Sequence, residues 1–377
     1  MKYFILKKIL LLIFLVIFAI SCSEDNSINS SDEVLNEWVG QMLMVGFRGL
    51  EIEHDSQIAT QIRLGRIGGV VLFSRDVALG SGIRNIQSPW QVKLLNSQLQ
   101  SHAKIPLLIA VDQEGGYVAR LNDVFGFPET VSQQYLGDAD NEFMTTLSGQ
   151  LTARTLSEAG FNQNLAPVVD LNINPESPAI GAIERSFSAS PDVVVRNSAI
   201  IIDEHRKKNL ITTLKHFPGH GSAKTDSHFG FTDVTTTWQN IELEPYRQLI
   251  NMNKADVVMT AHVFNSNLDA QYPATLSKKI ITGVLREQLN FDGVVITDDM
   301  NMKSITDHYG LENAIELTIL AGSDIIIFAN NLVYDELIAE KAHKIIVDLV
   351  KSGKISRGRI KISYDRVMKL KSQYLIN

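Results

Sequence analysis

The chain has 377 residues, of which 45% are hydrophobic and 20% are charged. This is ordinary globular composition, and it excludes an intrinsically disordered, collagen-like or low-complexity chain. The formal net charge of −7 argues against a nucleic-acid partner, and the single cysteine excludes an internal disulfide framework and any cysteine-rich metal site.

The N-terminal segment has the pattern of an export signal. Lysines at positions 2, 7 and 8 precede an unbroken apolar run over residues 9–20, which is short for a membrane span and typical of a signal-peptide core. The run leads to Cys22, the only cysteine, in a segment that resembles the lipobox of bacterial lipoproteins. We therefore expect a signal peptide over residues 1–21, lipidation of Cys22, and an extracytoplasmic protein held at a membrane only by its lipid. A plain secretory signal or an uncleaved anchor are the alternatives.

A polar tether is expected up to residue 32, and the body over residues 33–377 alternates strands and helices. Strands are predicted at eight apolar runs, near residues 42–45, 69–73, 107–111, 161–169, 210–214, 257–260, 293–297 and 325–328. Helical patterns lie between most of them and after the last, at residues 90–103, 144–159, 191–209, 241–253, 278–289, 311–321 and 335–352. This order predicts one TIM-type (β/α)8 barrel. An open doubly wound sheet is the alternative, but no glycine fingerprint follows the first strand.

Polar side chains follow many of the predicted strands. Active sites of such barrels form at the C-terminal ends of the strands, so we expect these side chains to meet at one mouth. They are Asp112, Asp170, Lys215 and His216, His262, Asp298 and Asp299, and Asn330.

The densest polar segment is KHFPGHGSAKTDSH, residues 215–228, which its glycines and proline predict to be a loop. Asp226 lies two residues before His228, so its carboxylate can orient an imidazole that acts first as a general acid and then as a general base. Two other interpretations are a structural turn and a metal site built from His216, His220, Asp226 and His228.

Two further features are suited to binding a sugar and reacting with it. A carboxylate at Asp298, directly after the strand GVVIT, could attack an anomeric carbon and form a covalent intermediate. In VDQEGGYVAR, residues 111–120, two glycines allow close approach of a ligand, while Asp112 and Arg120 offer an acceptor and a fork of donors.

Together these segments resemble the β-N-acetylglucosaminidase (β-hexosaminidase) branch of glycoside hydrolase family 3. VDQEGG, FNQNLAPVVDLN, ERSF, KHFPGHGSAKTDSH and TDDM stand in the family's order between Trp38 and the C-terminus. The resemblance implies that Asp298 is the nucleophile and that His228 is the general acid/base, with Asp226 as its partner. It also implies a set of residues that bind the sugar hydroxyls, namely Asp112, Arg120, Arg185, Lys215 and His216.

The resemblance implies a retaining exo-β-N-acetylglucosaminidase, without metal or other cofactor, that hydrolyses peptidoglycan or chitin-type fragments. Its partners would be glycans that contain N-acetylglucosamine, and a monomer is expected. Three alternatives remain open at this point: a phosphorylase that uses phosphate in place of water, a carbohydrate-binding lipoprotein without catalysis, and a metal-dependent barrel hydrolase.

Overall fold

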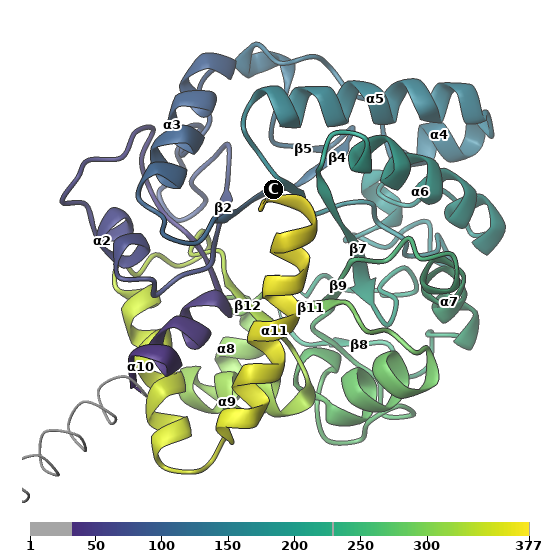
Figure 1. Cartoon of the computed structure of the whole chain (residues 1–377). Helices are drawn as coiled ribbons and strands as arrows, with labels where there is room; N and C mark the ends of the chain where they lie inside the picture. Colours follow the sequence, from purple (N-terminus) through teal and green to yellow (C-terminus); the bar gives the residue numbers. More distant parts are fainter. Residues whose placement is uncertain (1–31, 228–229, 377) are drawn as a thin grey trace, which may run out of the picture.

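The computed structural model describes residues 32–227 and 230–376. Eight parallel strands close into a barrel surrounded by helices, which confirms the TIM-type barrel (Figure 1). The predicted signal peptide with Cys22, and His228, lie outside the described residues. Around the barrel the strands are β1 (Leu43–Gly46), β2 (Gly69–Leu72), β3 (Leu108–Val111), β6 (Gln163–Asn164), β7 (Ile211–Phe217), β9 (Val257–Thr260), β11 (Val294–Asp299) and β12 (Ile325–Phe328).

All eight predicted strands are present, but the fourth is much shorter than residues 161–169. Within that range only the two residues of β6 pair regularly with the neighbouring strands β3 and β7. Further along, a single bridge joins Val168 to Lys215 of β7. Pro167 lies between these two regions, and because proline has no N–H to donate it interrupts the ladder.

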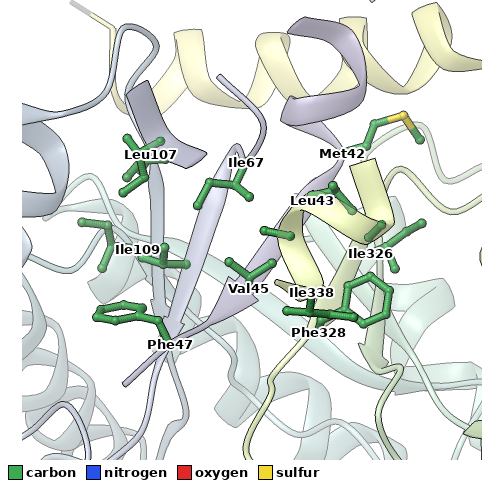
Figure 2. Packing of buried hydrophobic residues seen from close by; sticks show 14 of the residues in the cluster. Met42, Leu43, Val45, Phe47, Ile67, Leu107, Ile109, Ile326, Phe328 and Ile338 are labelled. Atoms are coloured by element: carbon green, nitrogen blue, oxygen red, sulfur yellow. The ribbon is translucent and has the colours of Figure 1, made fainter. Parts of the chain in front are cut away.

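The barrel strands are buried on both faces, which is why they appear in the sequence as nearly continuous apolar runs. In β1, Met44 belongs to the cluster inside the barrel, whereas Leu43 and Val45 belong to the cluster between the strands and the helices. Figure 2 shows this outer cluster, in which Ile338 lies beside Val45 of β1 and Phe328 of β12.

The outer helices largely follow the predicted order. Seven predicted helical segments correspond to α3 (Pro89–Ser101), α5 (Glu142–Glu158), α6 (Pro191–Arg206), η3 with α7 (Asn240–Leu243 and Glu244–Asn251), the π-helix η5 (Lys279–Gln288), α9 (Leu311–Ala321) and α10 (Ile338–Lys351). Further elements were not predicted from the sequence: α2 (Gln57–Arg63), α4 (Gln133–Ala139), α8 (Lys303–Tyr309), α11 (Arg357–Tyr374), the hairpin β4–β5 (Gln113–Gly115 and Val118–Ala119) and the pair β8–β10 (Thr232–Asp233 and Val263–Phe264). Residues 32–41 are also helical, and short 3₁₀ turns lie at η1 (Asp123–Phe125), η2 (Gly181–Ile183) and η4 (Ala274–Leu276).

The C-terminal helix α11 crosses the barrel at the N-terminal ends of the strands (Figure 1). Its residues Val367, Leu370 and Tyr374 join the cluster inside the barrel. Between them, the ammonium of Lys371 donates to the carbonyl of Gly68 at 2.8 Å and to Oε1 of Gln41 at 2.6 Å, just before β2 and β1. This end of the barrel is therefore covered, and a ligand must approach the opposite, C-terminal ends of the strands.

Within residues 32–227 and 230–376, no helix is both long and apolar enough to cross a membrane.

Candidate functional site

The ends of β3 and β7 bring a lysine between two carboxylates. The strand β7 continues to Phe217, so Lys215 and His216 lie in the strand rather than in the loop that the sequence predicted to start there. The ammonium of Lys215 lies 2.8 Å from Oδ1 of Asp112 and 2.6 Å from Oε1 of Glu114. Its side chain is only 2% exposed, so this charge is fixed in place by its two partners.

The hairpin β4–β5 places Glu114 and Arg120 beside Asp112. It depends on Gly115, whose φ is +103° and where a Cβ atom would lie 2.1 Å from the carbonyl oxygen of Val131. No other residue could make this close approach without moving the backbone. Directly after the return strand β5, Arg120 Nη2 donates to Oδ2 of Asp112 at 3.2 Å.

Arg185 reaches the same cluster from the loop after η2. Its Nε and Nη2 atoms donate to the two carboxylate oxygens of Glu114, each at 2.8 Å, and its Nη1 donates to the carbonyl of Ala179 at 2.8 Å. Glu114 was not among the site residues predicted from the sequence. The available signal was its position in VDQEGG, between Asp112 and the glycine pair.

The charges of this cluster keep both carboxyl groups ionised. Burial alone would raise the pKa of Asp112, but the charges of Lys215 and Arg120 hold that pKa well below its ordinary value. Burial also opposes ionisation of Glu114, and there Arg185 and Lys215 lower the pKa to about 2. The site therefore presents fixed anionic acceptors and cationic donors, an arrangement suited to sugar hydroxyl groups.

His216 is held by the buried Asp170 and is neutral. Its Nδ1 lies 2.7 Å from Oδ2 of Asp170, and its Nε2 lies 3.2 Å from Nη2 of Arg185. Burial, followed by the charges of Arg185 and Lys215, lowers the pKa of His216 well below its ordinary value. Because Arg185 can only donate, the neutral ring carries its proton on Nδ1 and accepts at Nε2.

Asp170 also holds the loop that follows β7. Its carboxylate accepts from the backbone N–H of His216, at 3.1 Å to both oxygens, and from that of His220 at 2.8 Å. Burial raises the pKa of Asp170, and these N–H groups oppose that shift. Asp170 thus shapes the barrel mouth by holding the start of the loop after β7.

The two aspartates at the end of β11 have different environments. Asp299 Oδ1 accepts from the backbone N–H of Ala329 at 2.8 Å and of Asn301 at 3.0 Å, so this side chain fixes the strand end. Asp298 is half-buried. Its negative charge acts to raise the pKa of His216, but burial and the positive charges of Arg185 and Lys215 lower that pKa by more. Asp298 lies near the C-terminal end of β11, as His216 does in β7, and both strands flank β9 in the barrel, so both residues are at the same mouth.

The loop after β7 carries Asp226. Asp226 is half-buried and its charge acts on His220, whose Nε2 lies 3.1 Å from Oγ of Ser227. His228 lies outside the described residues, so the predicted pairing of Asp226 with His228 stays a prediction. His262 is buried, with its ring nitrogens 2.8 Å from Oγ1 of Thr275 and 3.0 Å from the carbonyl oxygen of Asp299.

Among the residues that the structure describes, no group of three or more His, Cys, Asp or Glu side chains is arranged to hold a metal ion. The four-residue metal site considered from the sequence includes His228, which is outside that set.

Comparisons with known proteins agree with one another. The family model for the glycosyl hydrolase family 3 N-terminal domain matches residues 34–370. The beta-hexosaminidase of Tolumonas auensis is 34% identical over 294 residues, which are 77% of this chain and 83% of the relative. Beta-hexosaminidase A of Pseudoalteromonas piscicida is 31% identical over 330 residues, 81% of this chain, and the chain spans only 53% of that relative.

Two solved structures extend this likeness to the fold. A glycoside hydrolase family 3 beta-N-acetylglucosaminidase from a Paenibacillus species superposes with a TM-score of 0.82 at 33% identity, over 90% of this chain and 62% of that one. A beta-N-acetylhexosaminidase from Beutenbergia cavernae superposes with a TM-score of 0.79 at 26% identity, over 90% of this chain and 98% of the other.

Proposed function

The chain belongs to glycosyl hydrolase family 3 and is a glycoside hydrolase of that family; from this premise we propose that it is a retaining exo-β-N-acetylglucosaminidase. Its substrates are chitin-type or peptidoglycan fragments that end in β-linked N-acetylglucosamine. The observation that supports the proposal is the ion-paired cluster of Asp112, Glu114, Arg185 and Lys215 at the C-terminal ends of the strands, the same end of the barrel at which β11 carries Asp298.

In the proposed reaction, Asp112, Arg120, Arg185, Lys215 and His216 bind the terminal sugar. Asp112 is ionised, so it accepts from a hydroxyl group, while the cations donate. Because Lys215, Arg185 and Glu114 already hold one another by ion pairs, little ordering remains to be done when the sugar binds.

The Asp298 carboxylate then attacks the anomeric carbon, and the bond to the leaving oxygen breaks. His228, oriented by Asp226, donates a proton to that oxygen. In the second step His228 takes a proton from water, which attacks the anomeric carbon and releases Asp298. Two displacements at one carbon return the original β configuration.

The test uses para-nitrophenyl N-acetyl-β-glucosaminide and the full chain. Asp298→Asn keeps the size of the side chain but removes its nucleophilic charge, so kcat should fall about 10³-fold or more. Asp292→Asn is the matched control, because Asp292 is 80% exposed near the start of β11 and should leave kcat unchanged. The first-formed anomer, read by NMR, should be β. Wild-type turnover in Asp298→Asn, or inversion at the anomeric carbon, would overturn the assignment.

A phosphate arm separates hydrolysis from phosphorolysis. Free N-acetylglucosamine should form at the same rate with and without phosphate. A sugar phosphate that forms only when phosphate is present would make the enzyme a phosphorylase instead. Binding of glycans with no turnover of any substrate would favour the carbohydrate-binding alternative.

We also propose that the enzyme is exported and anchored through a lipid on Cys22. The support is the sequence pattern of residues 1–22. Labelled palmitate should enter the wild-type protein in a bacterial host and should not enter Cys22→Ser, and the variant should leave the membrane fraction. Equal labelling of both proteins would contradict the anchor.

A further inference from the structure

A strip of aromatic side chains joins the loops that follow β7, β9 and β11. Phe231 lies 5.3 Å from Phe264 and 5.9 Å from His308, measured between ring centroids. His308 is 6.4 Å from Tyr309, which lies 6.3 Å from Tyr272. These five rings come from three separate connections between barrel strands, so they are brought together by the fold.

The strip lies on the side of the mouth where the proposed reaction takes place. Phe231 follows Asp226 in the loop after β7, and α8, which ends in His308 and Tyr309, is the first helix after Asp298. The contact between Phe231 and His308 therefore connects the two segments that carry the proposed nucleophile and the partner of the proposed acid/base.

The position of Phe231 is fixed by backbone pairing. The next residue, Thr232, pairs with Val263, and Asp233 pairs with Phe264 in the parallel pair β8–β10. The N–H of Val234 donates to the carbonyl of Phe264 at 2.8 Å. This short sheet ties the loop after β7 to the loop after β9 and holds the two phenylalanine rings at the rim.

The strip is nevertheless open to solvent. Phe231 is 51% exposed, and His308 is also exposed. An aromatic ring of this size gains from removing its face from water, and a sugar ring offers a matching face of C–H groups. His308 adds a ring that can exchange a hydrogen bond with a sugar hydroxyl group.

The charges around the strip indicate whether the leaving sugar is neutral, as in chitin-type fragments, or carries a carboxylate, as in peptidoglycan fragments. The segments that carry the outer rings, residues 230–234, 263–268 and 303–309, contain one lysine, Lys303, against Asp233 and Asp307. They contain no arginine, the residue best suited to hold a carboxylate by two parallel hydrogen bonds. The strip therefore fits a neutral sugar better than one that carries a carboxylate.

We infer that Phe231 and His308, with Phe264 behind them, form the subsite for the leaving part of the substrate, and that this part is a neutral sugar such as the second N-acetylglucosamine of a chitin-type chain. The inference rests on the proposed function, because it assigns the neighbour of the sugar bound by Asp112 and Lys215. Binding energy from this remote sugar would be used to orient the scissile bond.

The experiment compares chitobiose with methyl N-acetyl-β-glucosaminide, whose leaving group is too small to reach a second subsite. Phe231→Ala should lower kcat/KM for chitobiose about tenfold and should change that for the methyl glycoside less than about twofold. Phe231→Trp keeps an aromatic face and should restore most of the loss. Phe143→Ala is the matched control, because Phe143 is 69% exposed on α5 and lies outside these loops. An equal loss on both substrates in Phe231→Ala and Phe231→Trp, or no loss on either, would overturn the subsite.

Two further arms separate this inference from the proposed function. With Asp298→Asn, which should not turn substrate over, Phe231→Ala should weaken binding of chitotriose about tenfold by calorimetry and leave binding of N-acetylglucosamine unchanged. If the wild type hydrolyses none of the substrates but this difference in binding is found, the proposed function fails and the subsite stands. If Phe231→Ala impairs only the disaccharide of N-acetylglucosamine and N-acetylmuramic acid, the neutral-sugar assignment is wrong.

Discussion

Glu114 and Arg185 form a doubly hydrogen-bonded ion pair, with both nitrogen–oxygen distances at 2.8 Å. The side chain of Glu114 is 1% exposed, and the same carboxylate lies 2.6 Å from the ammonium of Lys215. One buried acid therefore positions two of the cations proposed to bind the sugar. It acts through them, as a positioning residue, and removal of its charge would release both.

We predict that Glu114→Gln lowers kcat/KM about 10–100-fold, mostly through KM, because Arg185 and Lys215 lose their common anchor and misplace the sugar. A glutamine has the same size, but its single amide oxygen can accept only one of the two hydrogen bonds from Arg185. It also carries no charge to pair with Lys215. The measurement is steady-state kinetics on the para-nitrophenyl substrate, with inhibition by N-acetylglucosamine as a readout of binding at the same site. Glu129→Gln, an exposed residue near the hairpin, is the control. Unchanged KM and inhibition in Glu114→Gln would show that the cations do not need this anchor.

Asp170 should be more important for stability than for chemistry. Its carboxylate accepts two backbone N–H groups and the Nδ1–H of His216, so an amide NH₂ in its place would face donors. We predict that Asp170→Asn lowers the free energy of unfolding by about 2–4 kcal/mol. Urea denaturation measures this, with the exposed Asp138→Asn as the control. A change within about 0.5 kcal/mol would contradict the prediction, since surface substitutions give changes of that size.

The sequence predicts the barrel well because barrel strands are buried on both faces and therefore stand out as apolar runs. It predicts α11 poorly for the opposite reason. That helix is rich in lysine and arginine, and it is anchored by a few residues such as Val367, Leu370 and Lys371. The partner of Lys371, Gln41, is 330 positions away in the chain, so no local pattern could indicate the contact.

Within the site, the residues directly after the strands were predictable, because the ends of barrel strands meet at one mouth. Glu114 was not predictable in the same way, because its role depends on Arg185, which is 71 positions away. The different environments of Asp298 and Asp299 likewise depend on Ala329, which directly follows the neighbouring strand β12. Contacts of this kind are set by the closed fold and are not visible in a single linear sequence.

Glu242 makes a pH-dependent contribution to stability. It is fully buried under the loop after β7, where the Cβ atom that glycine lacks at position 219 would lie 2.7 Å from Glu242 Cβ. Its Oε1 accepts from the N–H of Gln239 at 3.2 Å, and hydrogen bonding to Ser222 and Gln239 opposes the effect of burial on its pKa. Burial raises the pKa of Glu242 to about 7.

Because this pKa is raised on folding, the unfolded chain releases the proton first, and stability is lost as the pH rises from about 4.5 to about 7. Glu242→Gln removes this loss and keeps an oxygen for Gln239. We predict that the variant is about 2–3 kcal/mol more stable than the wild type at pH 8 and equal to it near pH 4.5. Denaturant unfolding at a series of pH values measures the difference. A difference that does not vary with pH would mean that Glu242 keeps an ordinary pKa.

At higher pH, Lys371 should make the free energy of unfolding change with pH in the opposite direction. Burial beneath the barrel lowers the pKa of Lys371 to about 7, while the unfolded lysine keeps a pKa near 10.5. Between these two values the unfolded chain binds more protons than the folded chain, so stability rises with pH by up to about 1.4 kcal/mol for each pH unit. We predict that this rise is present in the wild type between pH 7.5 and 9 and absent in Lys371→Met.

The methionine leaves the carbonyl of Gly68 and the amide of Gln41 without their donor, so the variant has a lower stability at all pH values, by about 1–3 kcal/mol. The slope, rather than this offset, is the readout. Lys369→Met is the control, because Lys369 is 76% exposed on the same helix and should keep the wild-type slope. Parallel curves of stability against pH for Lys371→Met and the wild type would contradict the prediction. They would mean that Lys371 keeps its ordinary pKa and stays charged in the folded protein, stabilised by Gly68 and Gln41.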